Sequence, residues 1–142
     1  MKKGTKIVLL VVLIVVCVGL LAAALPFRIA PAARENWLAS HRAEELGAEP
    51  VSAQLLDTYT EGGLEVQLWR VAGGNGAEFY DAVAWQRGLL GRWRVLHTQW
   101  APRQEDPDWW MSFGFQCGLH WYSFDVTLST ETLAAPRKSF RL

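Results

Sequence analysis

Four residues in the second half of the chain have the side-chain types of a thiol-dependent active site. Cys117 offers a sulfur nucleophile, His97 and His120 offer imidazoles as general bases, and Asp125 offers a carboxylate to orient one of them. The sequence around them is weak support, because only a turn separates Cys117 from His120 and no cysteine-nucleophile motif surrounds the pair. A thiol enzyme that uses Cys117 with a nearby histidine is therefore an alternative, and no catalytic residue is assigned.

Metal and phosphate chemistry have even less support in the sequence. One sulfur and two nearby imidazoles fall short of the four ligands of a structural zinc site. The glycine-rich segment at residues 73–76 differs from a phosphate-binding loop, because the residues after it have the alternation of a strand and not the start of a helix. We expect neither a bound metal ion nor a cofactor.

Aromatic side chains are the stronger signal, since the chain of 142 residues contains eight tryptophans, all after residue 36. A small domain gains much of its stability from large buried side chains, and we expect Trp85, Trp109 and Trp121 in the core. Other tryptophans are out of phase with the apolar face of their own strands. They predict an exposed platform that stacks against sugar rings or holds a peptide, and these ligand-binding candidates are Trp69, Trp100 and Trp110.

A second candidate contact is a pair of leucines, Leu89 and Leu90, flanked by glycines and arginines between two predicted strands. Exposed leucines at the tip of a hairpin are usually incidental or fold back onto the sheet. The alternative is a small knob that docks on a partner or on a membrane surface.

The N-terminal part of the chain contains an uncharged apolar run at residues 7–27. As a helix these 21 residues would reach about 31 Å, close to the hydrocarbon thickness of about 30 Å, so they predict a transmembrane anchor in a lipid bilayer. A secretory signal cleaved near Ala24 is the alternative. Its apolar stretch would measure only about 7–15 residues, which favours the uncleaved anchor.

The orientation of this anchor follows from Lys2, Lys3 and Lys6, because basic flanks stay in the cytoplasm. Arg28 and Arg34 oppose this orientation only weakly. We therefore expect a single-pass protein of the cell membrane, with residues 1–6 as a cytoplasmic stub and residues 28–142 outside.

The exported part has a formal charge of about −3, with 11 basic and 14 acidic residues mixed along the chain. Its basic residues form no cluster, so no nucleic-acid partner is expected. Cys17 lies in the apolar run and Cys117 is far from it, which excludes a disulfide within this part of the chain.

Residues 28–50 predict a juxtamembrane helix and linker, with Pro31 suited to the first turn and Gly47 and Pro50 as stop signals. Trp37 on this helix either packs against the body or rests at the headgroup level. Residues 51–142 predict an antiparallel β domain, with strands at 51–60, 64–72, 78–86, 92–101, 109–117 and 119–128. The tail from residue 129 forms either a short helix or an edge segment.

The expected fold class is α+β, mainly β: a small antiparallel meander or curled sheet of about six strands, with one face covered by the helix and the other in contact with water. A small closed β-barrel is the alternative. The expected function is that of an anchored extracytoplasmic module, non-enzymatic, which binds a protein partner or ligand through an aromatic-rich sheet. A carbohydrate or cell-envelope binding domain is an alternative, with a glycan or an envelope protein as its partner.

Overall fold

The computed structural model describes residues 2–46, 52–74, 76–127 and 130–140. Two helices come first, followed by a series of strands that are all paired in antiparallel fashion. The elements are α1 (Lys3–Ala24), a 3₁₀ turn (Pro31–Ala33), α2 (Arg34–Leu46), β1 (Ser52–Glu61), β2 (Leu64–Ala72), β3 (Glu78–Arg87), β4 (Trp93–Pro102), β5 (Trp110–Cys117), β6 (His120–Thr127), β7 (Thr132–Leu133) and β8 (Arg137–Phe140).

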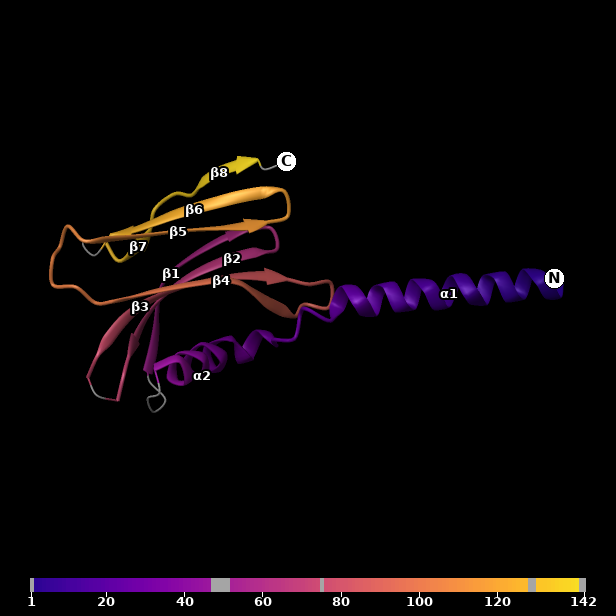
Figure 1. Cartoon of the computed structure of the whole chain (residues 1–142), viewed down its shortest axis with the longest axis horizontal. Coiled ribbons are helices and arrows are strands. Elements are labelled where there is room, and N and C mark those ends of the chain that lie inside the picture. The colour runs from indigo at the N-terminus through magenta and orange to yellow at the C-terminus, as the bar shows by residue number, and fades with distance from the viewer. Residues whose placement is uncertain (1, 47–51, 75, 128–129, 141–142) are drawn as a thin grey trace.

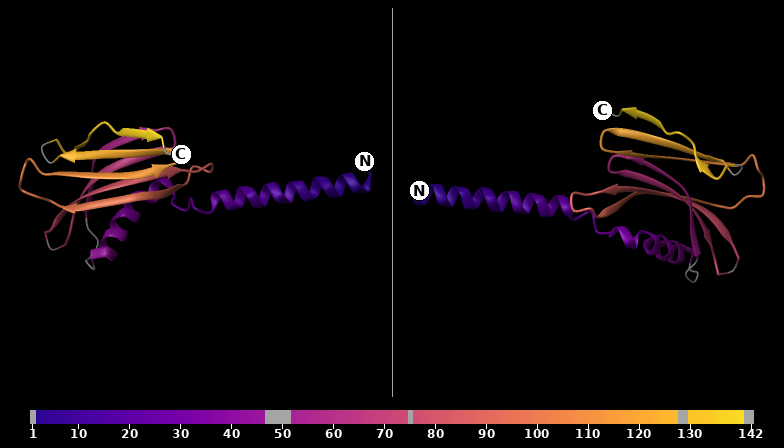
Figure 2. Two further views of the ribbon diagram at one scale, coloured as in Figure 1. Left: turned by 45° about the horizontal axis from the view of Figure 1, so that its top comes forward. Right: turned by 180° about the vertical axis from the view of Figure 1, so that it is seen from behind.

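The body has three layers (Figure 1). A first sheet with the strand order β1-β2-β3-β4 forms the middle layer, and α2 lies against one of its faces. A second sheet lies against the other face; it has the order β5-β6-β7, and β8 pairs with β6. Helix α1 projects away from all three layers (Figures 1 and 2).

Helix α1 confirms the predicted apolar helix, although it begins before residue 7 and ends at Ala24. Pro26 lies two residues beyond its end, as expected of a residue that cannot continue a helix. The large apolar side chains of α1 are between 51% and 67% exposed, so the body leaves them uncovered. The helix is long and apolar enough to cross a membrane.

The six predicted strands are confirmed as β1 to β6, each within one residue of its expected bounds. Of the two alternatives for the tail, the edge segment is correct, because β8 pairs with β6 from His120 to Ser123. Part of the predicted linker, residues 47–50, lies outside the described residues.

The expectation of one curled sheet is wrong, because the strands divide into two sheets between β4 and β5. The connecting segment 103–109 is mostly charged and contains Pro107, so it crosses over without extending the first sheet. The described strands do not close into a barrel. The two sheets instead bury a shared apolar core, made of Leu64, Val66, Leu68, Tyr80, Ala82, Ala84, Met111, Phe113, Phe115, Tyr122, Phe124 and Val126.

The expectation that one face of the sheet contacts water is also wrong for the first sheet. Helix α2 covers the side of this sheet that the second sheet leaves open. Leu38 of α2 and Trp85 of β3 are both fully buried at this contact. Trp37 meets the Trp85 ring edge-on at 5.2 Å between centroids. Of the two positions considered for Trp37, packing against the body is therefore correct.

Burial on both faces forces polar side chains of the first sheet to find partners inside the protein. The Gln67 amide oxygen accepts hydrogen bonds from the indole N–H groups of Trp69 at 3.1 Å and Trp85 at 2.9 Å. The Gln67 amide nitrogen donates to Glu65 at 2.8 Å, and Glu65 pairs with Arg34 at 3.0 Å. This network connects the start of α2 to the middle of the sheet.

A second connection between α2 and the sheet is an ion pair between Arg42 and Asp81, whose side chains are completely buried. Arg42 Nε donates to Asp81 Oδ2 at 2.7 Å, and the guanidinium also lies 5.2 Å from the Trp100 ring centroid. Removing one partner of a buried pair leaves an uncompensated charge, which costs more than removing both.

We predict that Arg42→Met or Asp81→Leu alone lowers the free energy of unfolding by about 3–5 kcal/mol, whereas the double variant recovers most of the loss. Chemical unfolding of the full chain in detergent, monitored by near-ultraviolet circular dichroism, measures the free energy of unfolding of each variant. The control is Arg103→Gln, which breaks an exposed pair with Glu78 and should cost less than about 1 kcal/mol. Single variants as mild as the control would contradict the prediction.

The second sheet is joined to the first by polar contacts at their edges. Glu131, in the turn before β7, binds Arg70 and accepts a hydrogen bond from the Tyr80 hydroxyl at 2.8 Å. Its backbone has a φ of 48°, a strained value for a residue with a side chain. Burial raises the Glu131 pKa, but the hydrogen bonds from Tyr80 and Arg70 outweigh burial and hold the pKa below its ordinary value of 4.5.

A depressed pKa means that Glu131 stabilises the fold above pH 4.5 and that this contribution is lost as the pH falls through the lower pKa of the folded state. We therefore predict that Glu131→Gln is less stable than the natural chain at pH 7, and that the difference shrinks between about pH 5 and pH 3. Unfolding curves over this range test it. A constant difference would mean that the Glu131 charge does not contribute.

Candidate functional site

The side of the second sheet that faces away from the first sheet is the open face of the body. We call it the outer face. Along each strand its side chains alternate with those that point into the core. Residues of the outer face also lie opposite one another on β5 and β6, as Trp110 does with Thr127 and Ser112 with Asp125. Its residues are Trp110, Ser112, Gly114 and Gln116 of β5, Trp121, Ser123, Asp125 and Thr127 of β6, and Arg137 and Ser139 of β8.

Trp110 is the most exposed aromatic side chain of the described residues, at 60%. It borders a shallow hollow of about 320 Å³ that is also lined by Ser112, Asp125, Thr127 and Arg137. Arg137 Nη2 donates to Asp125 Oδ2 at 3.3 Å across this hollow. An apolar ring therefore stands beside hydroxyl, carboxylate and guanidinium groups, a combination that suits ligands with both apolar faces and hydroxyl groups.

A second indole lies flat on the outer face. Gly114 makes room for it, because a Cβ at that position would lie 2.7 Å from Cζ2 of Trp121. The predicted core position of Trp121 is therefore wrong: its parity is opposite to that of Tyr122 and Phe124, and it lies half-buried on the outer face. Trp85, by contrast, is confirmed in the core, and Trp109 packs against the core while partly buried.

The structure does not bring the three predicted ligand-binding tryptophans together. Trp69 is only 6% exposed, so the exposure expected for it is wrong. Trp100 is partly buried beside Phe79, with 5.4 Å between ring centroids. Both indoles lie on the side of the first sheet that α2 covers, while Trp110 has the expected exposure on the far side of the second sheet.

The four residues considered for thiol chemistry do not converge on one point. Cys117 pairs with His120 at the end of the β5–β6 hairpin, whereas Asp125 lies on the outer face toward its other end. His97 lies against two neighbouring core rings, 6.3 Å from the centroids of both Phe113 and Phe115. Burial raises the pKa of the Cys117 thiol and lowers the pKa of His97, so both shifts oppose the ionised forms that a thiolate–imidazolium pair requires.

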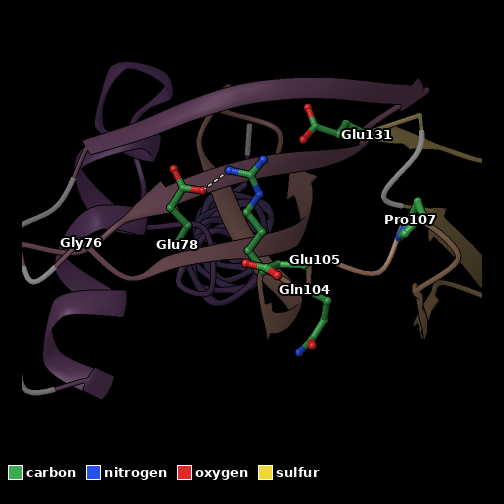
Figure 3. Close-up of a pocket in the computed structure, with 7 residues that line it drawn as sticks. Gly76, Glu78, Gln104, Glu105, Pro107 and Glu131 are labelled. Atoms are coloured by element: carbon green, nitrogen blue, oxygen red, sulfur yellow. Dashed lines mark hydrogen bonds and ion pairs between the residues drawn. The ribbon is translucent and has the colours of Figure 1, made fainter.

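A larger polar hollow of about 610 Å³ lies at the end of the body away from α1 (Figures 1 and 3). Figure 3 shows Glu78 on one side of it and Glu131 and Pro107 on the other. Glu78 is paired with Arg103, and Glu131 is held by Arg70 and Tyr80, so these groups already serve the fold. No sequence motif marked this hollow. Within the described residues, no group of histidine, cysteine or acidic side chains is arranged to hold a metal ion.

No known protein family, curated protein or solved structure matches this chain. The outer face at Trp110, with its exposed indole beside polar groups, is the candidate site.

Since burial raises the pKa of Cys117, its thiolate fraction at neutral pH should be smaller than that of an exposed thiol. We predict that, in a Cys17→Ser background, the folded chain reacts with iodoacetamide more slowly than glutathione does at pH 7.5. After unfolding in urea the rate should rise to that of the free thiol. Mass spectrometry of the time course measures the alkylation rate. If Cys117 in the folded chain is alkylated faster than glutathione, the result would favour the thiol-enzyme alternative.

Proposed function

We propose that this chain is a membrane-anchored extracytoplasmic binding module whose outer face holds an extended glycan of the cell envelope. The observation that carries the proposal is the Trp110 ring, 60% exposed beside a hollow lined by hydroxyl and charged groups. Exposed indole is costly to leave in water, and aromatic rings that face solvent beside polar groups are typical of recognition sites.

The spacing of the two outer indoles supports an extended ligand. Trp121 lies over Gly114, four residues along β5 from Trp110, which corresponds to about 13 Å. A single sugar ring is too short to contact both. A linear chain of several sugars lying along β5 would cover the two indoles, with its hydroxyl groups within reach of Ser112 and the pair of Asp125 and Arg137.

The anchoring part of the proposal is supported by α1, whose 22 residues carry no acidic side chain and whose apolar surface the body leaves uncovered. The lysines Lys2, Lys3 and Lys6 favour a cytoplasmic N-terminus and therefore an external body. Such a body would face the envelope, where polysaccharides are the abundant hydroxyl-rich polymers.

We predict that Trp110→Ala weakens binding to isolated envelope polysaccharide at least about tenfold, which corresponds to about 1.4 kcal/mol. Stability should change by less than about 1 kcal/mol, because the side chain is exposed. The matched control is Phe140→Ala, which removes another exposed ring, 59% accessible, that lies outside the outer face. Sedimentation of the full chain in detergent with insoluble polysaccharide, followed by titration with soluble fragments, measures the binding of both variants.

Equal binding by the Trp110 and Phe140 variants would overturn the glycan site. Capture of an envelope protein in place of glycan, lost in Trp110→Ala alone, would keep the outer face as the site and replace the ligand.

A further inference from the structure

The turn between β3 and β4 presents the two most exposed large apolar side chains of the described residues, Leu89 at 87% and Leu90 at 76%. The turn is held by its own backbone, because Gly91 N–H donates to Gly88 at 3.1 Å and Gly88 N–H donates to Arg92 at 2.7 Å. Gly91 has a φ of 71°, which glycine adopts without strain. The leucines are therefore presented by an ordered tip.

This tip lies beside the end of α1 (Figures 1 and 2). The Phe27 ring rests on Gly88 so closely that a Cβ there would lie 2.6 Å from the ring. Two backbone hydrogen bonds, of 3.0 and 2.8 Å, then join Ile29 to Trp93 at the start of β4. The chain that leaves α1 is thus fixed to the base of the β3–β4 hairpin, and the tip stays at the level of the helix end.

Between the helix end and the tip is a mainly apolar hollow of about 330 Å³. Its walls come from the last turn of α1, from Phe27 and from two hairpin turns of the first sheet. The lining residues are Ala23, Ala24, Phe27, Gly63, Arg87, Gly88 and Leu89. If α1 spans a bilayer, this hollow and the two leucines lie where the hydrocarbon meets the headgroups.

Basic side chains surround the tip, although the exported part of the chain is acidic as a whole. In the described part of the chain, no carboxylate lies within ion-pair distance of Arg28, Arg87 or Arg92. Arg92 Nη1 donates to the carbonyl of Arg28 at 3.3 Å, which holds these two residues together. Arginines at the border of a bilayer attract anionic lipid headgroups.

We propose that the tip of the β3–β4 hairpin is a membrane wedge: Leu89 and Leu90 enter the interfacial layer of the bilayer that holds α1, and Arg28, Arg87 and Arg92 bind anionic headgroups around them. The wedge rests on the proposed anchor, because the bilayer must lie at the end of α1. It adds a second, lateral contact between the body and the bilayer that holds α1.

The test uses the full chain with Cys17→Ser and Cys117→Ala, carrying one environment-sensitive fluorophore at either Leu90→Cys or Gln104→Cys. Gln104 is the matched control, because it is exposed and lies in the loop at the opposite end of the body. Each protein is reconstituted into phosphatidylcholine vesicles with or without phosphatidylglycerol, some containing lipids that carry a quencher near the headgroup. Flotation of the vesicles reports whether the chain is anchored.

We expect the probe at residue 90 to shift to shorter wavelength and to be quenched several-fold more than the probe at residue 104. Phosphatidylglycerol should increase this quenching, and Arg87→Gln with Arg92→Gln should remove the increase. A chain that floats with the vesicles while both probes are quenched equally overturns the wedge and leaves the anchor intact. A chain that does not float overturns the anchor and the wedge together. If the quenching at residue 90 changes neither with lipid charge nor with the arginine substitutions, the proposed headgroup contact is overturned.

Discussion

Burial of the first sheet on both faces is the constraint on which the rest of the structure depends. The second sheet covers one side with aromatic and aliphatic side chains, and α2 covers the other with Leu38 and Trp37. A polar residue in such a sheet has no water to bind, so it must have a partner in the protein. Gln67, which receives two indole N–H groups, and Asp81, which receives Arg42, meet this requirement. The same contacts fix α2 to the sheet in a body that has no disulfide.

Much of the fold could be predicted from the sequence because its signals are local. The alternation in β2 and β5 and the glycines at 62, 63 and 118 place strands and turns within short windows. The division into two sheets could not be predicted, because it depends on whether the segment 103–109 continues the first sheet or crosses over it. Charged side chains and Pro107 in that segment fit a solvated loop in either case.

The candidate site shows the same limit. Alternation assigns Trp69, Trp100 and Trp110 to the face opposite the apolar residues of their strands, and that parity is correct for Trp69 and Trp110. A register shift in β4 instead places Trp100 on the same side as Trp93 and Val95. Alternation does not say what covers the face that it assigns. For Trp69 the cover is α2, a helix distant in sequence, whereas Trp110 belongs to an outer sheet without a further layer. The position of Trp121 could be predicted only from a different signal, the absence of a Cβ at Gly114 on the neighbouring strand. The strand register is needed to know that these two residues lie side by side.

Strand β5 runs from Trp110, at the end of the body that carries the large polar hollow, toward the end that faces α1 (Figure 1). Its eight residues measure about 26 Å. On the proposed anchor the strand therefore acts as a rigid spacer, which sets the indole of Trp110 at a fixed height above the lipid surface. A polymer that lay directly on the headgroups would pass beneath this ring, while one suspended at about the height of the strand would meet it. The length of a single strand would then select ligands by their distance from the bilayer.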